Sequence, residues 1–581
     1  MKKICIKYKQ ILYPTLFTII YLAVIMSSFD IFLDNDDTSM SRIISGMMTG
    51  KPDAHCEFIK YAFGSIIAFF YKVMPNINWY ATFVDVLPGF LCVWVILYRI
   101  IENKLITTNL RCVVVSFCVL LLYSVLCFGQ LLEPQWTISA GFLGSAAVFL
   151  WHTNQWEKDS KLKCVFEMLL ITILLMSCYA IRSFAFLMFV VPMAFLTVVR
   201  FIQKKKLVYD LIIVFVVVIC AFSMELIEEK AYSSDEYAEL KIMNSYRAAI
   251  ADYGGLPDYN ENREIYEKYG ISYEEQYLVS GLAAYEFFED LTVEKLYNYV
   301  RVLNEVNLNK AEKKNTFFDA ILNVKIALWN KQCSVLLVSL LIILILSTVI
   351  LVTSRDWHSL LTIYLIVLLY FFMCVYLGYK NRFPFRVLFI VFFSLYMTVF
   401  AILYNYLCKK TNKVVSKLKC SKVFFTLLLL GFITDALLQG NQTIDSYKVS
   451  YESNVNQSYL FDYMKEADSQ LFLLGPDFRT FKEKYRFFFD LNKYNYIKMT
   501  GWATITPAFD TMIKEDSSED ISQVVIKRND IYIATDNLYW IEIIPNYYNS
   551  IGYNLAYNVK DIVRTSQKVY YIIELYNVLG D

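Results

Sequence analysis

The sequence is poor in charge and in the residue patterns of metal and disulfide chemistry. Only 19% of its 581 residues are charged and the net charge is +1; a typical soluble protein has ~25% charged residues. No Cys-x-x-Cys pair occurs, no cysteine follows position 420, and the three histidines lie far apart. These absences argue against a nucleic-acid-binding protein, a disulfide-stapled fold and a Cys/His zinc site.

Long apolar runs are abundant, and hydrophobic residues make up 57% of the chain. A helix needs about 20 apolar residues to cross a bilayer. We therefore predict an α-helical polytopic membrane protein with about 11 spans. The predicted spans are 11–31, 79–98, 112–132, 136–151, 164–180, 183–199, 207–226, 332–353, 359–377, 386–407 and 423–439.

Lysine and arginine predict the orientation of these spans. They are concentrated before the first span, between the sixth and seventh, and between the tenth and eleventh, whereas the short loops on the other side hold few. Positively charged short loops stay in the cytoplasm. We therefore expect a plasma-membrane protein with a cytoplasmic N-terminus and an extracytoplasmic C-terminal region.

Segment 56–75 is apolar enough to be considered as a twelfth span. If it crossed, the cations Arg99, Lys104 and Arg111 would fall outside. Its apolar residues recur at helical spacing, and the charged residues Glu57, Lys60 and Lys72 are interspersed among them. This pattern favours an amphipathic helix lying on the outer membrane surface.

Three segments are then expected outside the membrane: 32–78, 227–331 and 440–581. We divide the chain into a transmembrane domain, 1–439, and a small C-terminal extracytoplasmic α/β domain, 440–581. Strand-like runs at 470–474, 531–535 and 568–575 alternate there with helical stretches at 456–466 and 537–548.

Three carboxylates, Asp34, Asp36 and Asp37, stand where the first span ends. Carboxylates beside a bilayer are costly unless they face water or a cavity. One interpretation is a solvated loop that ends the helix. The other is a general base or an acidic substrate-binding site, because adjacent carboxylates raise each other's pKa toward neutrality.

Further charged side chains stand at the outer ends of other spans. Arginine has a fixed charge and a fork of donors suited to phosphate oxygens. Any one of these charged residues alone is typical of a helix end. Together, the carboxylates and arginines suit transfer from a lipid-phosphate donor. The residues are Glu133, Arg182, Arg247, Asp252, Arg382 and Arg386.

Four stretches carry a resemblance to a known superfamily. They are NDDxxM…SGxxTGxPD (35–53), RxxxxDYxxLPxY (247–259), the turn RFPFR (382–386) and GWxxxxP (501–507). With the acidic motif after the first span, the chain resembles the GT-C membrane glycosyltransferases, and in particular a group of bacterial multi-span proteins of surface-polysaccharide loci. The resemblance covers most of the chain.

The resemblance implies an enzyme that transfers a sugar, with inversion, from a polyprenyl-phosphate donor to an extracytoplasmic glycan, lipid or protein. Asp36 or Asp37, and next Asp34, would be the catalytic base. Arg382, Arg386 and Arg182 would hold the donor phosphate. Some members of the superfamily use a divalent cation at the acidic motif and others do not, so Mg²⁺ or Mn²⁺ at Asp36 and Asp37 stays open. No glycine-rich phosphate loop is visible, which speaks against direct use of a nucleotide sugar.

Aromatic residues are 17% of the chain. Trp79, Trp136 and Trp151 stand at span ends, as in interfacial belts. Trp502 is a candidate for a glycan contact, with a core tryptophan as the alternative. Two other functions remain open: a polysaccharide polymerase or ligase, and a lipid-linked glycan transporter or flippase, which would be expected to carry ionisable residues at the bilayer midplane.

Overall fold

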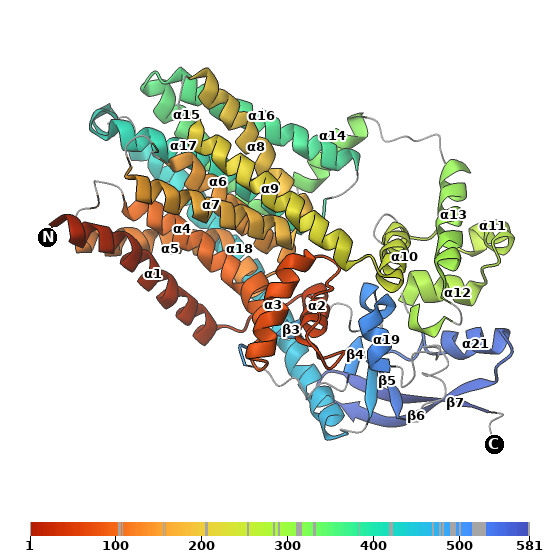
Figure 1. The fold of residues 1–581 in the computed structure, drawn as a ribbon. Helices are drawn as coiled ribbons and strands as arrows, with labels where there is room; N and C mark the ends of the chain where they lie inside the picture. Colours follow the sequence, from red (N-terminus) through yellow and green to blue (C-terminus); the bar gives the residue numbers. More distant parts are fainter. Residues whose placement is uncertain are drawn as a thin grey trace.

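A computed structural model describes most of the chain (Figure 1). The described residues are 2–102, 106, 108–154, 156, 159–203, 207–251, 255–282, 285–288, 291–309, 317–328, 333–380, 383–417, 422–467, 470–475, 478, 482–488, 496–498, 501–513 and 530–578.

Nine of the described helices are long and apolar enough to cross a membrane, which confirms the polytopic class. Each matches a predicted span. They are α1 (Lys2–Ser28), η1 with α4 (Ala81–Val86 and Leu87–Ile101), α5 (Asn109–Leu132), α7 (Lys161–Ile181), α8 (Ser183–Ile202), α9 (Val208–Ala231), α15 (Ser334–Thr353), α16 (Trp357–Tyr379) and α17 (Phe385–Lys417).

The other two predicted spans also lie in helices, α6 (Trp136–Thr153) and α18 (Lys422–Glu466). Helix α6 packs against α4, α7, α8 and α17, and nearly all of its side chains are buried. Small residues allow this close packing: a Cβ atom at Gly144 would lie 2.2 Å from the ring of Phe189. Helices α6 and α18 are not among the nine described helices that are long and apolar enough to cross a membrane. The total of eleven spans therefore stays a prediction.

Segment 56–75 forms a short helix, α3 (Tyr61–Val73), of 13 residues. This is too short to cross a bilayer, which requires about 20 residues. One face, with Ile67 and Tyr71, is buried, whereas Ile66 and Phe69 on the other face are 53% and 60% exposed. A helix with an apolar exposed face is expected of a segment that lies along a membrane surface.

The segment between α9 and α15 contains several helices, of which only the last, among those described, packs on a helix of the bundle. It comprises α10 (Asp235–Ala251), η2 (Asn260–Asn262), α11 (Arg263–Lys268), α12 (Tyr273–Tyr277), η3 (Leu278–Leu282), η4 (Tyr285–Phe287), α13 (Val293–Asn309) and α14 (Phe317–Leu328). Helices α10 and α13 pack together, and α14 packs on α16.

The C-terminal region contains a five-stranded mixed sheet in the order β4-β2-β5-β7-β6. The predicted strands at 470–474, 531–535 and 568–575 are confirmed as β2, β5 and β7. The elements are β2 (Leu471–Leu474), β3 (Glu483–Lys484), β4 (Tyr496–Lys498), η8 (Trp502–Ile505), α19 (Pro507–Ile513), β5 (Ile531–Thr535), α21 (Ile543–Ser550), β6 (Leu555–Arg564) and β7 (Val569–Asn577). Strands β2, β4 and β5 are parallel, and β7 pairs antiparallel with β5 and β6.

This sheet, the helices α10–α13 and the helices α2 (Asn35–Ser45) and α3 lie at one end of the bundle (Figure 1). Strand β1 (Phe32–Leu33), just after α1, pairs antiparallel with β3 of the C-terminal region. Helix α18 runs unbroken through position 440, so the predicted domain boundary falls inside a helix. The N-terminal acidic motif and the C-terminal region therefore share one structure at this end.

Candidate functional site

The acidic motif begins the helix α2. Asp34 precedes the helix, and Asp36 and Asp37 occupy its first turn. The backbone N–H and the hydroxyl of Thr38 both donate to the backbone oxygen of Asp34, each at 3.0 Å. Carboxylates are favourable at a helix N-terminus because of its exposed N–H groups and dipole. This local preference explains why three carboxylates can stand so close together.

Asp37 is fully buried and is bonded on both carboxylate oxygens. Tyr80 donates its hydroxyl to Oδ1 at 3.0 Å, and the backbone N–H of Trp136 donates to Oδ2 at 3.4 Å. Asp37 thus caps the first turn of α6 from another part of the chain. Gln135, the residue before α6, donates its amide to Asp34 at 2.7 Å. The acidic motif is therefore docked onto the N-terminus of the central helix of the bundle.

A second buried carboxyl, Asp85, faces Asp37. Asp85 lies in η1, the π-helical segment at the start of the α4 span. Both oxygens of the Asp85 carboxyl are buried, and neither accepts a hydrogen bond from the described residues. Burial, and next the charge of Asp85, hold the pKa of Asp37 well above its usual range.

Asp36, like Asp34, is half-buried, whereas Asp37 is buried. The indole N–H of Trp502, in η8 of the C-terminal region, donates to its Oδ1 at 3.1 Å. Burial and the charge of Asp34 raise the pKa of Asp36, while the Trp502 bond, Arg386 and Arg247 act in the opposite direction. Two of the predicted arginines are therefore within electrostatic range of this carboxylate.

Aromatic rings connect Asp36 to a third predicted arginine. The Phe58 ring lies 5.0 Å from Trp502, edge to face, and 5.2 Å from Trp136, stacked. The guanidinium of Arg182 lies 4.2 Å from the Trp136 ring. The indole N–H of Trp136 is buried and has no acceptor among the described residues. A buried donor without a partner is costly in free energy, so this N–H is a candidate ligand contact.

Arg247 lies on the buried face of α10. Its Nε donates to Asn244 at 2.6 Å, and Asn244 donates its amide to Glu57, in the segment between α2 and α3. Burial raises the pKa of Glu57 to about 7. The segment after α9 thus contacts Glu57 and brings the charge of Arg247 near Asp36.

Glu133 has a different environment. It accepts from Lys482 at 2.6 Å and from Ser450 at 2.6 Å, and so ties the turn between α5 and α6 to α18 and the C-terminal region. The remaining predicted residues, Asp252 and Arg382, lie outside the described residues. The structure therefore brings together Asp34, Asp36, Asp37, Arg182, Arg247, Arg386 and Trp502, and gives Glu133 an architectural contact.

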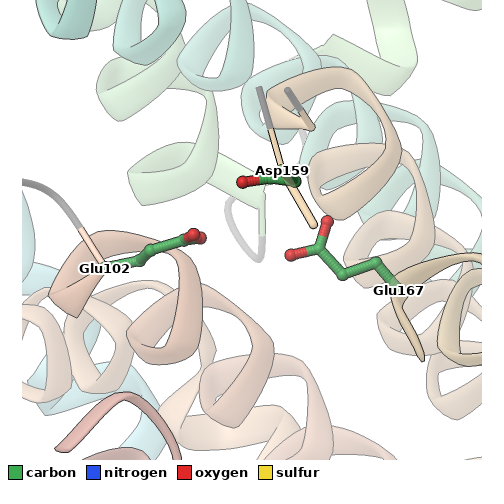
Figure 2. A group of neighbouring side chains, drawn as sticks. All are labelled: Glu102, Asp159 and Glu167. Atoms are coloured by element: carbon green, nitrogen blue, oxygen red, sulfur yellow. The ribbon is translucent and has the colours of Figure 1, made fainter. Parts of the chain in front are cut away.

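Three other carboxylates converge at the opposite end of the bundle (Figure 2). Glu102, Asp159 and Glu167, from the end of α4 and the start of α7, have ligand atoms within 4.8 Å of one another. Two cations lie among them. Lys163 pairs with all three carboxylates, and Arg99 pairs with Glu102 and Glu167 at 2.6 and 2.7 Å. Because ammonium and guanidinium groups neutralise the carboxylates, we interpret this cluster as an ion-pair network joining two spans.

Sequence reasoning missed several of these residues. Asp85 was visible only as a carboxylate near the end of a span, a signal that is functional by default in membrane proteins. The predicted belt position of Trp136 and Trp151 differs from the structure, in which they are 2% and 1% exposed inside the bundle. Trp151 donates to Asp210 at 2.8 Å. Position at a span end does not distinguish a lipid-facing ring from a buried one.

Comparison with known proteins adds no relative: no protein-family model, no curated protein and no solved structure matches the chain.

Proposed function

We propose that the chain is a membrane glycosyltransferase that moves a sugar from a polyprenyl-phosphate donor to an extracytoplasmic acceptor. The observation that carries the proposal is the environment of Asp36. A half-buried carboxylate with a raised pKa stands at the membrane-adjacent end of the bundle, with Arg247 and Arg386 within electrostatic range. A base and fixed cations in one place are what displacement of a phosphate leaving group requires.

Asp36 is the proposed base. It takes the proton of the acceptor hydroxyl while the hydroxyl oxygen attacks the anomeric carbon. The bond from that carbon to the phosphate oxygen breaks, and polyprenyl phosphate leaves with the electron pair, so the configuration inverts. Asp37 is less suited to this role because it is fully buried and both of its oxygens accept hydrogen bonds within the protein.

Arg386 and Arg182 are the proposed contacts of the donor phosphate. Both side chains are partly exposed, and Arg386 stands at the start of the α17 span, where a lipid-linked phosphate can reach it. The neighbouring rings of Trp136, Phe58 and Trp502 supply the aromatic surface on which sugar rings stack. A divalent cation at Asp36 remains compatible with this proposal.

The placement of charge supports a transferase over a transporter. The buried ionisable residues of the described spans stand near span ends: Asp85, Arg99, Glu167, Arg200 and Asp210. Arg200 and Asp210 pair with each other at 2.9 Å, as Arg99 and Glu167 do at 2.7 Å. A transporter would be expected to carry its ionisable residues near the midplane.

Binding of the expected leaving group tests the proposal. Purified full-length protein is titrated with undecaprenyl phosphate. Loss of one charge-assisted contact should weaken binding of this lipid about tenfold in Arg386→Gln. Asp36→Asn should bind at least as tightly as wild type, since it removes a negative charge. The matched control is Arg301→Gln, an arginine of the outer helix α13. Equal binding by wild type, Arg386→Gln and Arg301→Gln would contradict the proposal.

A further inference from the structure

A second concave site lies on the other side of α2 from Asp36. Thr38, Ser41 and Arg42 share one face of the helix at positions i, i+3 and i+4, and Asp36 lies on the opposite face. These three residues line a pocket together with Asn78, Lys484 and Arg486. The pocket is therefore built from the acidic-motif helix, the segment after α3 and the segment around β3.

Positive charge is in excess in this pocket. Arg42 pairs with Glu483 at 3.2 Å, and Lys484 pairs with Asp30 at 2.7 Å. Arg486 is exposed and makes no ion pair with the described part of the chain. Two cations are thus balanced by carboxylates, and one guanidinium is left for an external anion.

Exposed apolar side chains stand in the two chain segments that lead to Asn78 and follow Arg486 of the pocket. On α3 and just after it, Phe69, Val73 and Met74 are 60%, 56% and 52% exposed, and Phe488, two residues after Arg486, is 71% exposed. The two segments are joined by a β-bridge between Ile77 and Phe488, and the backbone N–H of Asn78 donates to the carbonyl of Phe487 at 2.9 Å. We call this set the α3–β3 edge: Phe69, Val73, Met74, Phe488 and Arg486.

We propose that the α3–β3 edge binds an anionic membrane phospholipid, with the lipid phosphate at Arg486 in the pocket and the apolar side chains in the acyl boundary. An uncompensated cation next to exposed aromatic and aliphatic residues matches the layering of a bilayer surface. Guanidinium groups pair with phosphate through two parallel hydrogen bonds. The position supports this, because α3 lies beside the ends of the spans (Figure 1).

The lipid would hold the C-terminal region and α2 at the membrane surface together. Arg42 already joins α2 to β3 and to β4, where it donates to the carbonyl of Tyr496 at 3.2 Å. A headgroup at Arg486 would add a third partner to this junction. The inference is independent of the proposed sugar transfer, since it concerns the opposite face of α2 and needs no donor or acceptor.

Lipid retention measured by native mass spectrometry tests the inference. The full chain is extracted from nanodiscs of equal phosphatidylglycerol and phosphatidylcholine content, and the bound copies of each lipid are counted. Wild type should retain phosphatidylglycerol preferentially. One basic residue near an anionic surface contributes about fivefold to lipid affinity, so Arg486→Gln should lower the preference about fivefold. Arg564→Gln, at an exposed arginine on β6, should retain the wild-type preference.

Two further measurements test the apolar half of the edge and the source of the phosphate. Phe488→Ser should lower retention of both lipids while the preference persists, because only the apolar half of the edge is weakened. Inorganic phosphate at millimolar concentration should not displace the lipid. Equal preference in wild type, Arg486→Gln and Arg564→Gln, or displacement by inorganic phosphate, would overturn the assignment to a lipid headgroup.

Discussion

The indole N–H of Trp502 donates a hydrogen bond of 3.1 Å to the carboxylate of Asp36, although 466 residues separate the two in the chain. The bond joins the C-terminal region to the acidic motif at the end of the first span. It makes the C-terminal region part of the proposed site, since the donor sets both the orientation and the proton affinity of the proposed base.

Trp502→Phe removes this donor and keeps an aromatic ring against Phe58. A hydrogen bond to a charged group contributes about 1.5–3 kcal/mol, so we expect transfer activity (kcat/KM) to fall about tenfold or more. Trp540→Phe is the matched control, because Trp540 is also buried in the C-terminal region and donates to Thr535 at 3.1 Å. A similar loss of activity in both variants would mean that the effect is only structural.

The pH dependence of transfer should follow the charges around Asp36. The base must be deprotonated, so activity falls as the pH drops through its raised pKa. Arg247→Gln removes a charge that lowers this pKa and should move the acidic limb of the profile to higher pH. Asp34→Asn removes a charge that raises the pKa and should move the limb to lower pH. Shifts in the same direction in both variants would contradict the assignment of Asp36.

The carboxyl pair of Asp37 and Asp85 should make stability depend on pH. The folded state binds a proton at Asp37 more tightly than the unfolded state does, so the free energy of unfolding should fall as the pH rises above the ordinary aspartate pKa. Asp85→Asn removes the facing charge and leaves an amide that can donate to Asp37. The decrease should therefore be smaller in Asp85→Asn.

Thermal unfolding in detergent at pH 5 and pH 8 measures this effect. Asp37→Asn has only one acceptor oxygen for Tyr80 and the Trp136 N–H, and so should be destabilised at both pH values by about 1–3 kcal/mol. An identical pH slope in wild type and Asp85→Asn would show that the charge of Asp85 does not raise the pKa of Asp37.

The ion-pair network at the other end of the bundle should be insensitive to divalent cations. Glu167→Gln leaves Arg99 buried with less charge compensation, and we expect a loss of about 3 kcal/mol in the free energy of unfolding. Glu305→Gln, which breaks an exposed pair with Lys268, should have no measurable effect. Mg²⁺ or Mn²⁺ should change the Tm of wild type and Glu167→Gln by the same amount; a rise confined to wild type would indicate a metal centre at Glu102, Asp159 and Glu167.

The spans and the three C-terminal strands were predictable because their signals are local. Runs of about 20 apolar residues, and short strand-like runs such as Ile531–Thr535, carry their structure in consecutive residues. The placement of Asp36, Asp37 and Asp34 after the first span was also visible in the sequence. What they contact was not.

Long-range partners account for the rest of the site. The capping of α6 by Asp37, the electrostatic effect of Asp85 on Asp37 and the contact of Asp36 with Trp502 each join segments distant in sequence. Hydropathy cannot distinguish Asp36 from Asp37, because the two are neighbours of the same type. Helix geometry turns Asp37 into the core and leaves Asp36 accessible, which decides between them as the proposed base.

The most direct test of the account measures surface glycan composition in cells that lack the protein and are complemented with wild type, Asp36→Asn or the control Asp462→Asn, a carboxylate of α18. Each variant must first reach the membrane at wild-type levels. The account predicts that one sugar is lost in the deletion strain and in the Asp36→Asn strain, and restored by wild type and Asp462→Asn. Full restoration by Asp36→Asn would contradict the role of Asp36 as the base.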